Sequence, residues 1–361
     1  MGSQGVTYSQ TSCIRILYEN STLLRKFWEI ENSITSRECH VLNPDEHCAL
    51  KQVEKSLKYV DGRYQVAIPW KEEDPKLPDN YGMALRRLCN TEKRLLKSPE
   101  IAEAYSKNIM QYLEKGYIRK MDPAEEKPSR KWYLPHFPVV RPDRATTKTR
   151  IVFDASAKCD GISLNDVIYQ GPKLQRGLNY VLLRFKRRPV ALICDIAEMY
   201  LRIEVAPKDR SCRRFLWRSM DQKKEPEESE FNRVVFGLNS SPFHVQFVSQ
   251  FHAERHKDEL PLAAETVSKS TYMDDSMDSM SDDSRGIELY KQLEELWNKA
   301  GMHARKWMSN STKVVEKIPI EDRASDVDTN EDPSPTVKTL GVTWLPEEDV
   351  FTFKANPPEE P

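Results

Sequence analysis

The chain of 361 residues is long enough for about two domains with their own cores. Its 39% of apolar and 9% of aromatic residues exclude a disordered protein. With 55 basic and 56 acidic side chains, the net charge of −1 excludes a global positive field, so any binding of nucleic acid must use local basic patches.

Glycines, cysteines and apolar runs exclude further classes of protein. None of the 12 glycines lies in a glycine-rich phosphate loop, which argues against P-loop and dinucleotide-binding folds. The seven cysteines are scattered without a CxxC pair, which argues against structural zinc and against a secreted disulfide scaffold. We therefore expect an intracellular, cytoplasmic protein. No apolar run approaches the roughly 18 residues of a membrane span, so no membrane partner is expected.

In chain order, the first elements fall in and just after an N-terminal region, residues 1–80. Residues 64–70 alternate between apolar and polar side chains, which predicts a strand. A helix is predicted to begin at Pro99, since proline is preferred at the first helical position, and to end at Gly116.

Strand-like and helical pieces then alternate from residue 133 to about residue 280. Residues 214–217 and 231–236 predict a hairpin, with the charged segment 221–230 at its tip. A helix follows Ser240, and three of its aromatic residues are expected to pack inward: Phe243, Phe247 and Phe251.

Two acidic segments carry the chemistry. Residues 190–196 form an apolar strand that delivers Asp195 near its end, and Asp274 and Asp275 lie at a predicted tight turn. Phosphoryl transfer with two metal ions needs carboxylates that converge on ions about 3.5–4 Å apart. Each segment alone has an ordinary alternative, a helix cap or a solvated turn. The segment 276–279 is also more polar than expected for the buried strand after such a turn.

Taken in order, several segments resemble the reverse transcriptases of BEL/Pao-class LTR retrotransposons. They are residues 132–142 (WYLPHFPVVRP), 146–156 (TTKTRIVFDAS), 195–200 (DIAEMY), 236–243 (FGLNSSPF), 272–275 (YMDD) and 340–342 (LGV). The resemblance spans nearly the whole chain. It implies an α+β fold, a right-hand polymerase palm and fingers, in which an antiparallel palm sheet is backed by helices.

The resemblance implies an RNA-directed DNA polymerase, a nucleotidyltransferase that extends a primer on an RNA or DNA template with dNTPs. The implied cofactor is Mg²⁺, as two ions, with Mn²⁺ as an alternative. Residues 81–310 would form the fingers and palm. Residues 311–361 would form a flexible acidic loop, primer-grip-like strands and a truncated C-terminus.

The parent element would be a retrotransposon Pol polyprotein, located by analogy in a cytoplasmic virus-like particle. Its protease, ribonuclease H and integrase domains would be absent from this chain. An inactive or co-opted polymerase-like protein that binds nucleic acid is the alternative function.

The resemblance also implies the catalytic residues. The implied metal ligands are Asp195, Asp274 and Asp275. Lys306 would protonate the leaving pyrophosphate as a general acid, with an ordinary exposed lysine as the alternative. Leu340 and Gly341 would belong to the strand that grips the primer end.

The implied dNTP-binding residues are Arg150, Tyr200, Phe236 and Gly237. Arg150 would clamp the triphosphate, because a guanidinium meets phosphate oxygens with two donors. Tyr200 would act as a gate against the 2′-hydroxyl, and Gly237 would allow close approach of the backbone. A solvated strand charge for Arg150 and a half-buried aromatic residue for Tyr200 are the alternatives.

Two other signals stay open at this stage. His252 and His256 lie one helical turn apart and would suit zinc, but no third ligand is evident, and a polar helix face is the alternative. The basic clusters 184–188 and 210–214 suit contacts with a phosphate backbone, or they belong to solvated surface.

Overall fold

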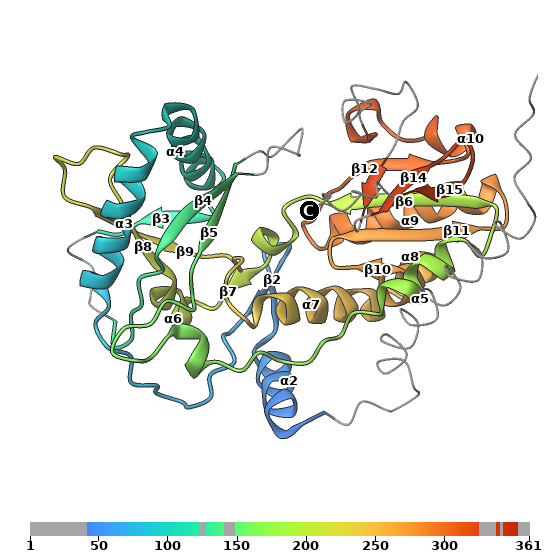
Figure 1. Ribbon diagram of the computed structural model, residues 1–361. Coiled ribbons are helices and arrows are strands. Elements are labelled where there is room, and N and C mark those ends of the chain that lie inside the picture. The colour runs from blue at the N-terminus through green and yellow to red at the C-terminus, as the bar shows by residue number, and fades with distance from the viewer. Residues whose placement is uncertain are drawn as a thin grey trace, which may run out of the picture.

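The computed structural model describes residues 42–122, 124, 128–140, 149–324, 337–339 and 342–352. The described chain is a mixed α/β protein whose elements group into two lobes (Figure 1). The first lobe is formed mainly by the described parts of residues 81–168 and 211–238. The second lobe is formed mainly by those of residues 178–196 and 260–352. Across the described residues, no helix combines the length and apolar character needed to cross a membrane.

The second lobe is built on an antiparallel sheet with the strand order β10-β11-β6-β12. The strands are β6 (Val190–Ile196), β10 (Thr271–Tyr272), β11 (Asp275–Met280) and β12 (Ala304–Ser309). Strand β11 pairs with β6 so that Asp275 lies opposite Asp195 and Met280 opposite Val190. Because a slip of one residue would turn every side chain to the other face, this register decides which acids share a face.

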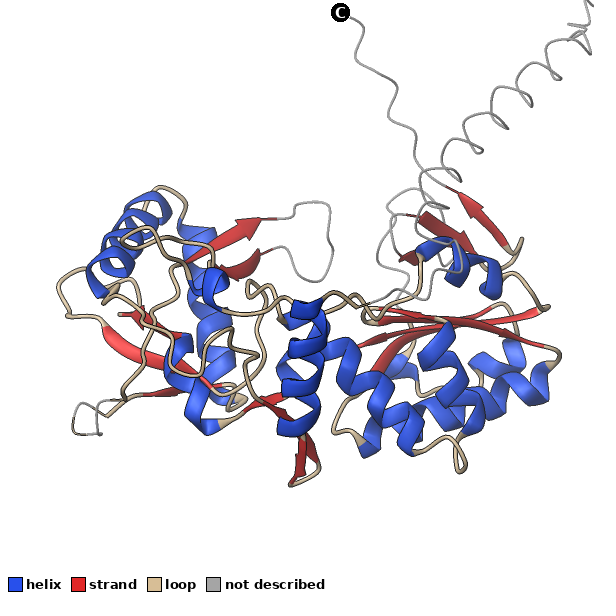
Figure 2. Cartoon of the chain, turned by 90° about the horizontal axis from the view of Figure 1, so that it is seen from below, coloured by secondary structure: helices blue, strands red, loops and turns tan. Residues whose placement is uncertain are grey.

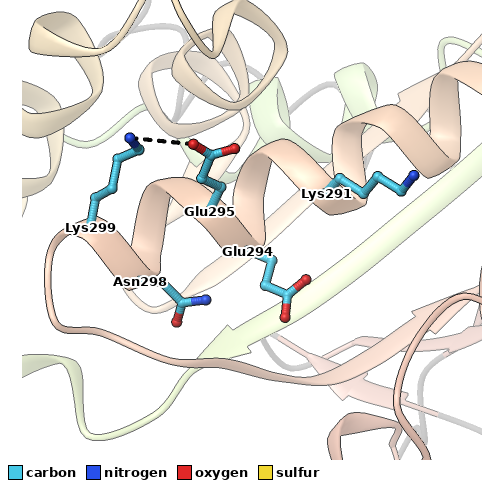
Figure 3. A pocket seen from close by; sticks show the side chains of 5 residues that line it. All are labelled: Lys291, Glu294, Glu295, Asn298 and Lys299. Carbon is cyan, nitrogen blue, oxygen red and sulfur yellow. Dashed lines mark ion pairs between the residues drawn. The ribbon is translucent and has the colours of Figure 1, made fainter.

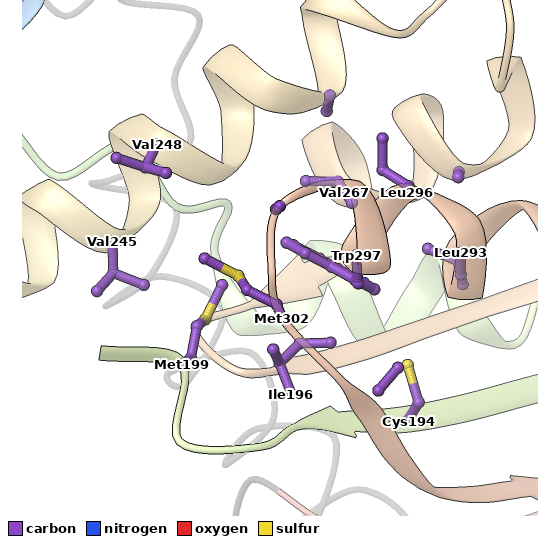
Figure 4. Packing of buried hydrophobic residues seen from close by; sticks show 14 of the residues in the cluster. Cys194, Ile196, Met199, Val245, Val248, Val267, Leu293, Leu296, Trp297 and Met302 are labelled. Carbon is purple, nitrogen blue, oxygen red and sulfur yellow. The ribbon is translucent and has the colours of Figure 1, made fainter. Parts of the chain in front are cut away.

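Strand β6 is apolar along most of its length because both of its faces are covered. Its even-numbered residues pack against α8 (Pro261–Lys269) and α9 (Asp283–Lys299) in a large core (Figure 4). Its odd-numbered apolar residues pack in a smaller core with α5 (Leu178–Phe185). Figure 2 shows the layer of helices on one side of the sheet. Since side chains alternate along a strand, Asp195 lies on the face of the smaller core.

The first lobe contains two small antiparallel sheets and two long helices. One sheet has the order β3-β9-β8, and the other pairs β4 with β5. The elements are α3 (Tyr81–Leu95), α4 (Pro99–Glu114), β3 (Ile118–Lys120), β4 (His136–Val140), β5 (Thr149–Phe153), β8 (Arg214–Trp217) and β9 (Glu227–Phe231). The start of α4 at Pro99 confirms the predicted helix start, and Gly116 follows its end with a φ of +67°.

Aromatic rings fill the centre of the first lobe. The ring of Phe153 lies 4.7 Å from that of Phe231 and 5.3 Å from that of Phe215, both in edge-to-face geometry. Tyr105 and Trp217 extend this cluster, with ring centroids 5.4 Å apart. Such edge-to-face pairs are favoured by the ring quadrupole, beyond the burial of apolar area.

Short elements from distant parts of the chain connect the lobes. They are α2 (Pro44–Ser56), β1 (Lys58–Val60), β2 (Arg63–Val66), η1 (Leu164–Val167), η2 (Met199–Arg202), β7 (Glu204–Val205), α6 (Pro207–Arg210), η3 (Ser211–Arg213) and α7 (Ser241–Arg255). Strand β2 pairs with β1 in antiparallel and with β7 in parallel orientation. Tyr64 on β2 is buried and bonds to Nδ1 of His252 on α7 at 2.8 Å. The described residues before residue 80 therefore share cores with later segments.

The C-terminal part adds a helical turn and a three-stranded antiparallel sheet to the second lobe. The elements are α10 (Thr312–Val315), η4 (Ile320–Asp322), β13 (Val337–Thr339), β14 (Val342–Leu345) and β15 (Val350–Thr352). Trp344 is fully buried, with its ring 5.0 Å from that of Phe185 on α5. Residues 325–336, most of the predicted acidic loop, lie outside the described residues.

Two sequence predictions in the hairpin and helix regions are wrong. The second strand of the hairpin is Glu227–Phe231, so the charged segment supplies most of it. This is feasible because Arg214 neutralises Glu228 and Glu230, at 3.0 and 3.4 Å. Phe251, which was expected to pack inward, is 40% exposed at the surface of α7.

Candidate active site

The β10–β11 hairpin carries the two acids of the YMDD segment to the end of β6. Met273 turns the chain with a φ of +57°. The backbone N–H of Ile196 donates to the carbonyl oxygen of Asp274 at 2.9 Å. One residue further on, Asp275 lies directly opposite Asp195 in the antiparallel register. The fold therefore brings the three acids together from two segments that are distant in sequence.

The negative charge of Asp195 acts on the carboxyl group of Asp274. The pKa of the Asp274 carboxyl is raised, first by desolvation among surrounding protein atoms and second by the negative charge of Asp195. Nearby positive charge would relieve this repulsion.

The carboxylates suit Mg²⁺ as a pair that would need further ligands from a substrate. Among the described residues, no group of three His, Cys, Asp or Glu side chains is arranged to hold a metal ion. In proteins Mg²⁺ commonly takes one or two carboxylates together with substrate phosphates and water. Two repelling carboxylates, Asp195 and Asp274, fit that pattern, and Asp275 lies beside them across the sheet.

Lys306 reaches the same carboxylates from the other side of β6. It lies where the pairing of β12 with β6 shifts register, and its φ is +51°. Its Nζ is 3.1 Å from Oδ2 of Asp195, and its side chain is 45% exposed. A bulge of this kind commonly re-aims a side chain next to a functional site. The irregular strand thus places a cation on Asp195.

Two residues outside the sheet also lie within electrostatic reach of Asp274. Arg150, exposed on β5 of the first lobe, acts to lower the pKa of the Asp274 carboxyl, as does Lys306. Tyr200 is buried on η2, and its pKa is raised, first by burial and second by the charge of Asp274. The site therefore combines acids from the second lobe with a guanidinium from the first.

Phe236 and Gly237 form the edge of the site at the first lobe. Gly237 has a φ of +110°, and a Cβ there would lie 1.8 Å from the backbone oxygen of Phe153, so no other residue fits. Phe236 is 57% exposed, and its ring centroid lies 4.0 Å from that of Tyr200. The cavity behind Phe236 measures about 20 Å³, too small for a nucleotide. The exposed ring of Phe236 therefore offers a flat apolar surface to solvent.

A buried polar network that the sequence did not reveal holds the hairpin. Asp278 on β11 is 1% exposed, accepts a hydrogen bond from Thr266 at 2.9 Å and lies 3.6 Å from the guanidinium of Arg184 on α5. Burial acts to lower the pKa of Arg184, but Asp278 and Glu265 outweigh it and raise that pKa. The polar character of segment 276–279 is thereby explained, because its partners are buried with it.

Two arginines of the basic clusters and His252 have structural roles, whereas Lys186, Arg187 and Arg188 of the first cluster are exposed. Arg184 is buried against Asp278, and Arg213 is fully buried and donates to the backbone oxygen of Arg233 at 2.8 Å. These arginines do not face solvent. His252 bonds to Tyr64 and to the backbone oxygen of Leu296 at 2.7 Å, so both ring nitrogens are occupied, which is incompatible with a zinc ligand.

Leu340 and Gly341, the predicted primer-grip residues, lie outside the described residues. Strand β14 begins directly after them, at Val342, and β13 ends just before them, at Thr339. Their role stays a prediction.

A larger open hollow of about 620 Å³ lies along α9 (Figure 3). Its lining residues are Lys291, Glu294, Glu295, Asn298 and Lys299. All of them belong to one helix, none is a predicted site residue, and Lys299 and Glu295 already pair at 3.3 Å. This hollow is therefore separate from the carboxylate site.

Comparison with known proteins gives only partial structural matches. No protein-family model matches the chain, and no curated protein matches it either. A prototype foamy virus protease–reverse transcriptase is similar over 57% of this chain and 24% of its own, with 17% identity and a TM-score of 0.42. A foamy viral protease–reverse transcriptase solved with double-stranded DNA is similar over 65% of this chain and 32% of its own, with 15% identity and a TM-score of 0.42. The chain thus spans at most about a third of either neighbour's length.

Proposed function

We propose that the chain is the fingers-and-palm core of an RNA-directed DNA polymerase from a BEL/Pao-class retrotransposon Pol polyprotein. It would extend a primer on an RNA or DNA template with dNTPs. In this proposal residues 81–310 hold the fingers and palm, with the first lobe as fingers and the second lobe as palm.

One observation carries the proposal. The turn with Asp274 closes against the end of β6 through the 2.9 Å bond from Ile196, and Asp275 faces Asp195 in register. Two-metal phosphoryl transfer needs carboxylates on rigid neighbouring strands at one point, and this hairpin supplies them.

The residues around the carboxylates would bind and orient the nucleotide. Arg150 is exposed and within electrostatic reach of Asp274, and we expect its guanidinium to hold the triphosphate with two donors. The exposed ring of Phe236 lies against the buried ring of Tyr200, and the sugar and base would rest on this pair, which would leave no room for a 2′-hydroxyl. Gly237 keeps the backbone at this edge free of a side chain.

In this proposal Asp195 and Asp274 would hold Mg²⁺ or Mn²⁺, with Asp275 beside them. The bound ions would lower the pKa of the primer hydroxyl and neutralise the triphosphate and its leaving group. Lys306 Nζ carries the proton that we assign to the leaving pyrophosphate. Its ion pair with Asp195 shows that the ammonium group reaches the carboxylates.

The same ion pair favours the alternative function. Lys306 pairs with Asp195, and a protein that binds nucleic acid but has lost catalysis would keep this ion pair. The two functions differ in one measurable property, metal-dependent synthesis.

Primer extension on an RNA template, with Mg²⁺ or Mn²⁺, separates the two. We expect the wild type to extend the primer and Asp274→Asn to lose at least about 100-fold in rate, because a neutral amide cannot replace a carboxylate ligand. The matched control is Asp258→Asn, the same change at an exposed position between α7 and α8, which should keep the wild-type rate.

Circular dichroism and template binding would be measured in parallel to show that each variant is folded. A folded wild type that binds template but extends no primer with either ion would overturn the polymerase proposal and support the alternative. Equal rates for wild type and Asp274→Asn would overturn the assigned site.

A further inference from the structure

Two carboxylates at the junction between the lobes are already neutralised by several cations. Glu198 accepts hydrogen bonds from Lys115 at 2.6 Å and from Arg202 at 3.5 Å. Glu204 forms an ion pair with Arg233. Neither carboxylate belongs to the candidate active site. The negative charges of Glu198 and Glu204 are therefore already balanced by Lys115, Arg202 and Arg233.

Arg63, at the start of β2, adds a cation that has no carboxylate of its own. Arg210 lies 3.7 Å from Glu204 and competes for that acid, while Arg63 forms no ion pair with any described residue. The pKa of Arg63 is lowered, first by burial and then by the positive charges of Arg233 and Arg202, which outweigh Glu204. The position is thus electrostatically unfavourable for a guanidinium unless an anion is present.

The pairing of the strands places Arg63, Glu204 and Arg233 on one face. Side chains two residues apart share a face of a strand, so Arg63 lies on the face of Gln65. Gln65 pairs with Glu204 of β7, and Glu204 in turn forms a bridge with Arg233. The guanidinium of Arg233 also lies 6.0 Å over the ring of Tyr117, which fixes its position.

Each of the three arginines has a donor atom without a partner. Nη1 of Arg63, Nε of Arg202 and Nε of Arg233 make no hydrogen bond, and Arg233 is only 8% exposed. Unpaired buried donors and like charges are both costly, and such features persist mainly where function requires them. A group with several acceptor oxygens and negative charge would satisfy both.

We propose that Arg63, Arg202 and Arg233, the junction arginines, form a binding site for a phosphate group. The group is either free, as in pyrophosphate, or part of a nucleic-acid backbone. The site uses none of the active-site carboxylates, so it does not depend on the proposed polymerase activity.

Thermal unfolding of the whole chain in EDTA tests the site without metal chemistry. Pyrophosphate, at constant ionic strength, should raise the midpoint of the wild type by about 3 °C or more. Arg63→Gln should lose this rise, yet unfold without pyrophosphate at the same temperature as the wild type or higher, because a repelling charge is removed. The control is Arg285→Gln, an exposed arginine of α9 that pairs with Glu288 at 2.6 Å.

A second arm measures binding of a short fluorescent DNA duplex in EDTA. A several-fold loss of affinity in Arg63→Gln, but not in Arg285→Gln, would assign the site to a nucleic-acid backbone if pyrophosphate has no effect. If pyrophosphate raises the unfolding midpoint of the wild type and of Arg285→Gln but not that of Arg63→Gln, the site binds free phosphates. If wild type and both variants respond alike to each probe, the proposal is wrong. Arg202→Gln, where Lys115 still pairs with Glu198, replaces Arg63→Gln if the latter does not fold.

Discussion

The centre of the first lobe is filled by packed aromatic rings, whereas in the second lobe a buried ion pair joins strand β11 to helix α5. In the first lobe, Phe153 meets both Phe215 and Phe231 edge to face, and these two rings are tilted against each other. In the second lobe, Asp278 of β11 lies against Arg184 of α5. Apolar packing tolerates small shifts, but a buried charge pair permits essentially one arrangement. The pair therefore places a strict geometric requirement on the strand that follows Asp275.

The largest expected effect comes from breaking the ion pair of the second lobe. Arg184→Met would leave Asp278 buried and charged without its partner, at a cost of about 3–5 kcal/mol in the free energy of unfolding. Chemical denaturation followed by circular dichroism measures this loss.

The double variant Arg184→Met with Asp278→Leu removes both charges and serves as the control. It should recover most of the stability, to within about 1–2 kcal/mol of the wild type. A single variant that loses less than about 1 kcal/mol would show that the pair does not hold the hairpin.

The pH dependence tests the packing of the first lobe. His136 is buried between Tyr105 and the backbone oxygen of Leu216, and burial lowers its pKa to about 4. Between pH 6.5 and pH 4 the unfolded chain binds a proton that folded His136 does not. The free energy of unfolding should therefore fall as the pH drops through this window, by up to about 3 kcal/mol from this residue.

Denaturation midpoints at pH 7 and pH 5 would measure that effect. His136→Gln should flatten the pH dependence, although His252 and His244, whose pKa values burial lowers to about 4 and about 3, retain part of it. The control is His303→Gln, where the imidazole is half-exposed and paired with Asp322. Equal slopes for His136→Gln and the wild type would contradict the prediction.

The smallest expected effect concerns the close approach of Gly237 to Phe153 within the first lobe. Gly237→Ala forces a Cβ against the backbone oxygen of Phe153 at a positive φ, so we expect a loss of about 1–3 kcal/mol and weaker dNTP binding. Gly82→Ala is the matched control, because no atom lies within 4 Å and alanine favours the interior of α3. Unchanged stability in Gly237→Ala would show that the backbone at residue 237 can move away from Phe153 at no cost.

Local patterns in the sequence were sufficient for several elements. The apolar run 190–196 is strand β6, and the proline at residue 99 begins α4. The second strand of the predicted hairpin was placed too late in the chain, at residues 231–236. The true strand, Glu227–Phe231, is acidic, and it fits into a sheet because Arg214 neutralises Glu228 and Glu230. Partners that lie far apart in sequence leave no local signal, which is why that strand could not be found from its own residues.

The sequence by itself determined which chemistry the chain could carry: Asp195 after an apolar strand, and Asp274 with Asp275 at a turn. Only the tertiary structure decided that β11 pairs with β6 in the register that places these acids together. It also revealed the buried partner Arg184 of Asp278 and the unpaired charge of Arg63. The physical reason is that strand pairing, burial and charge balance depend on contacts between distant segments, whereas residue identity and spacing are local.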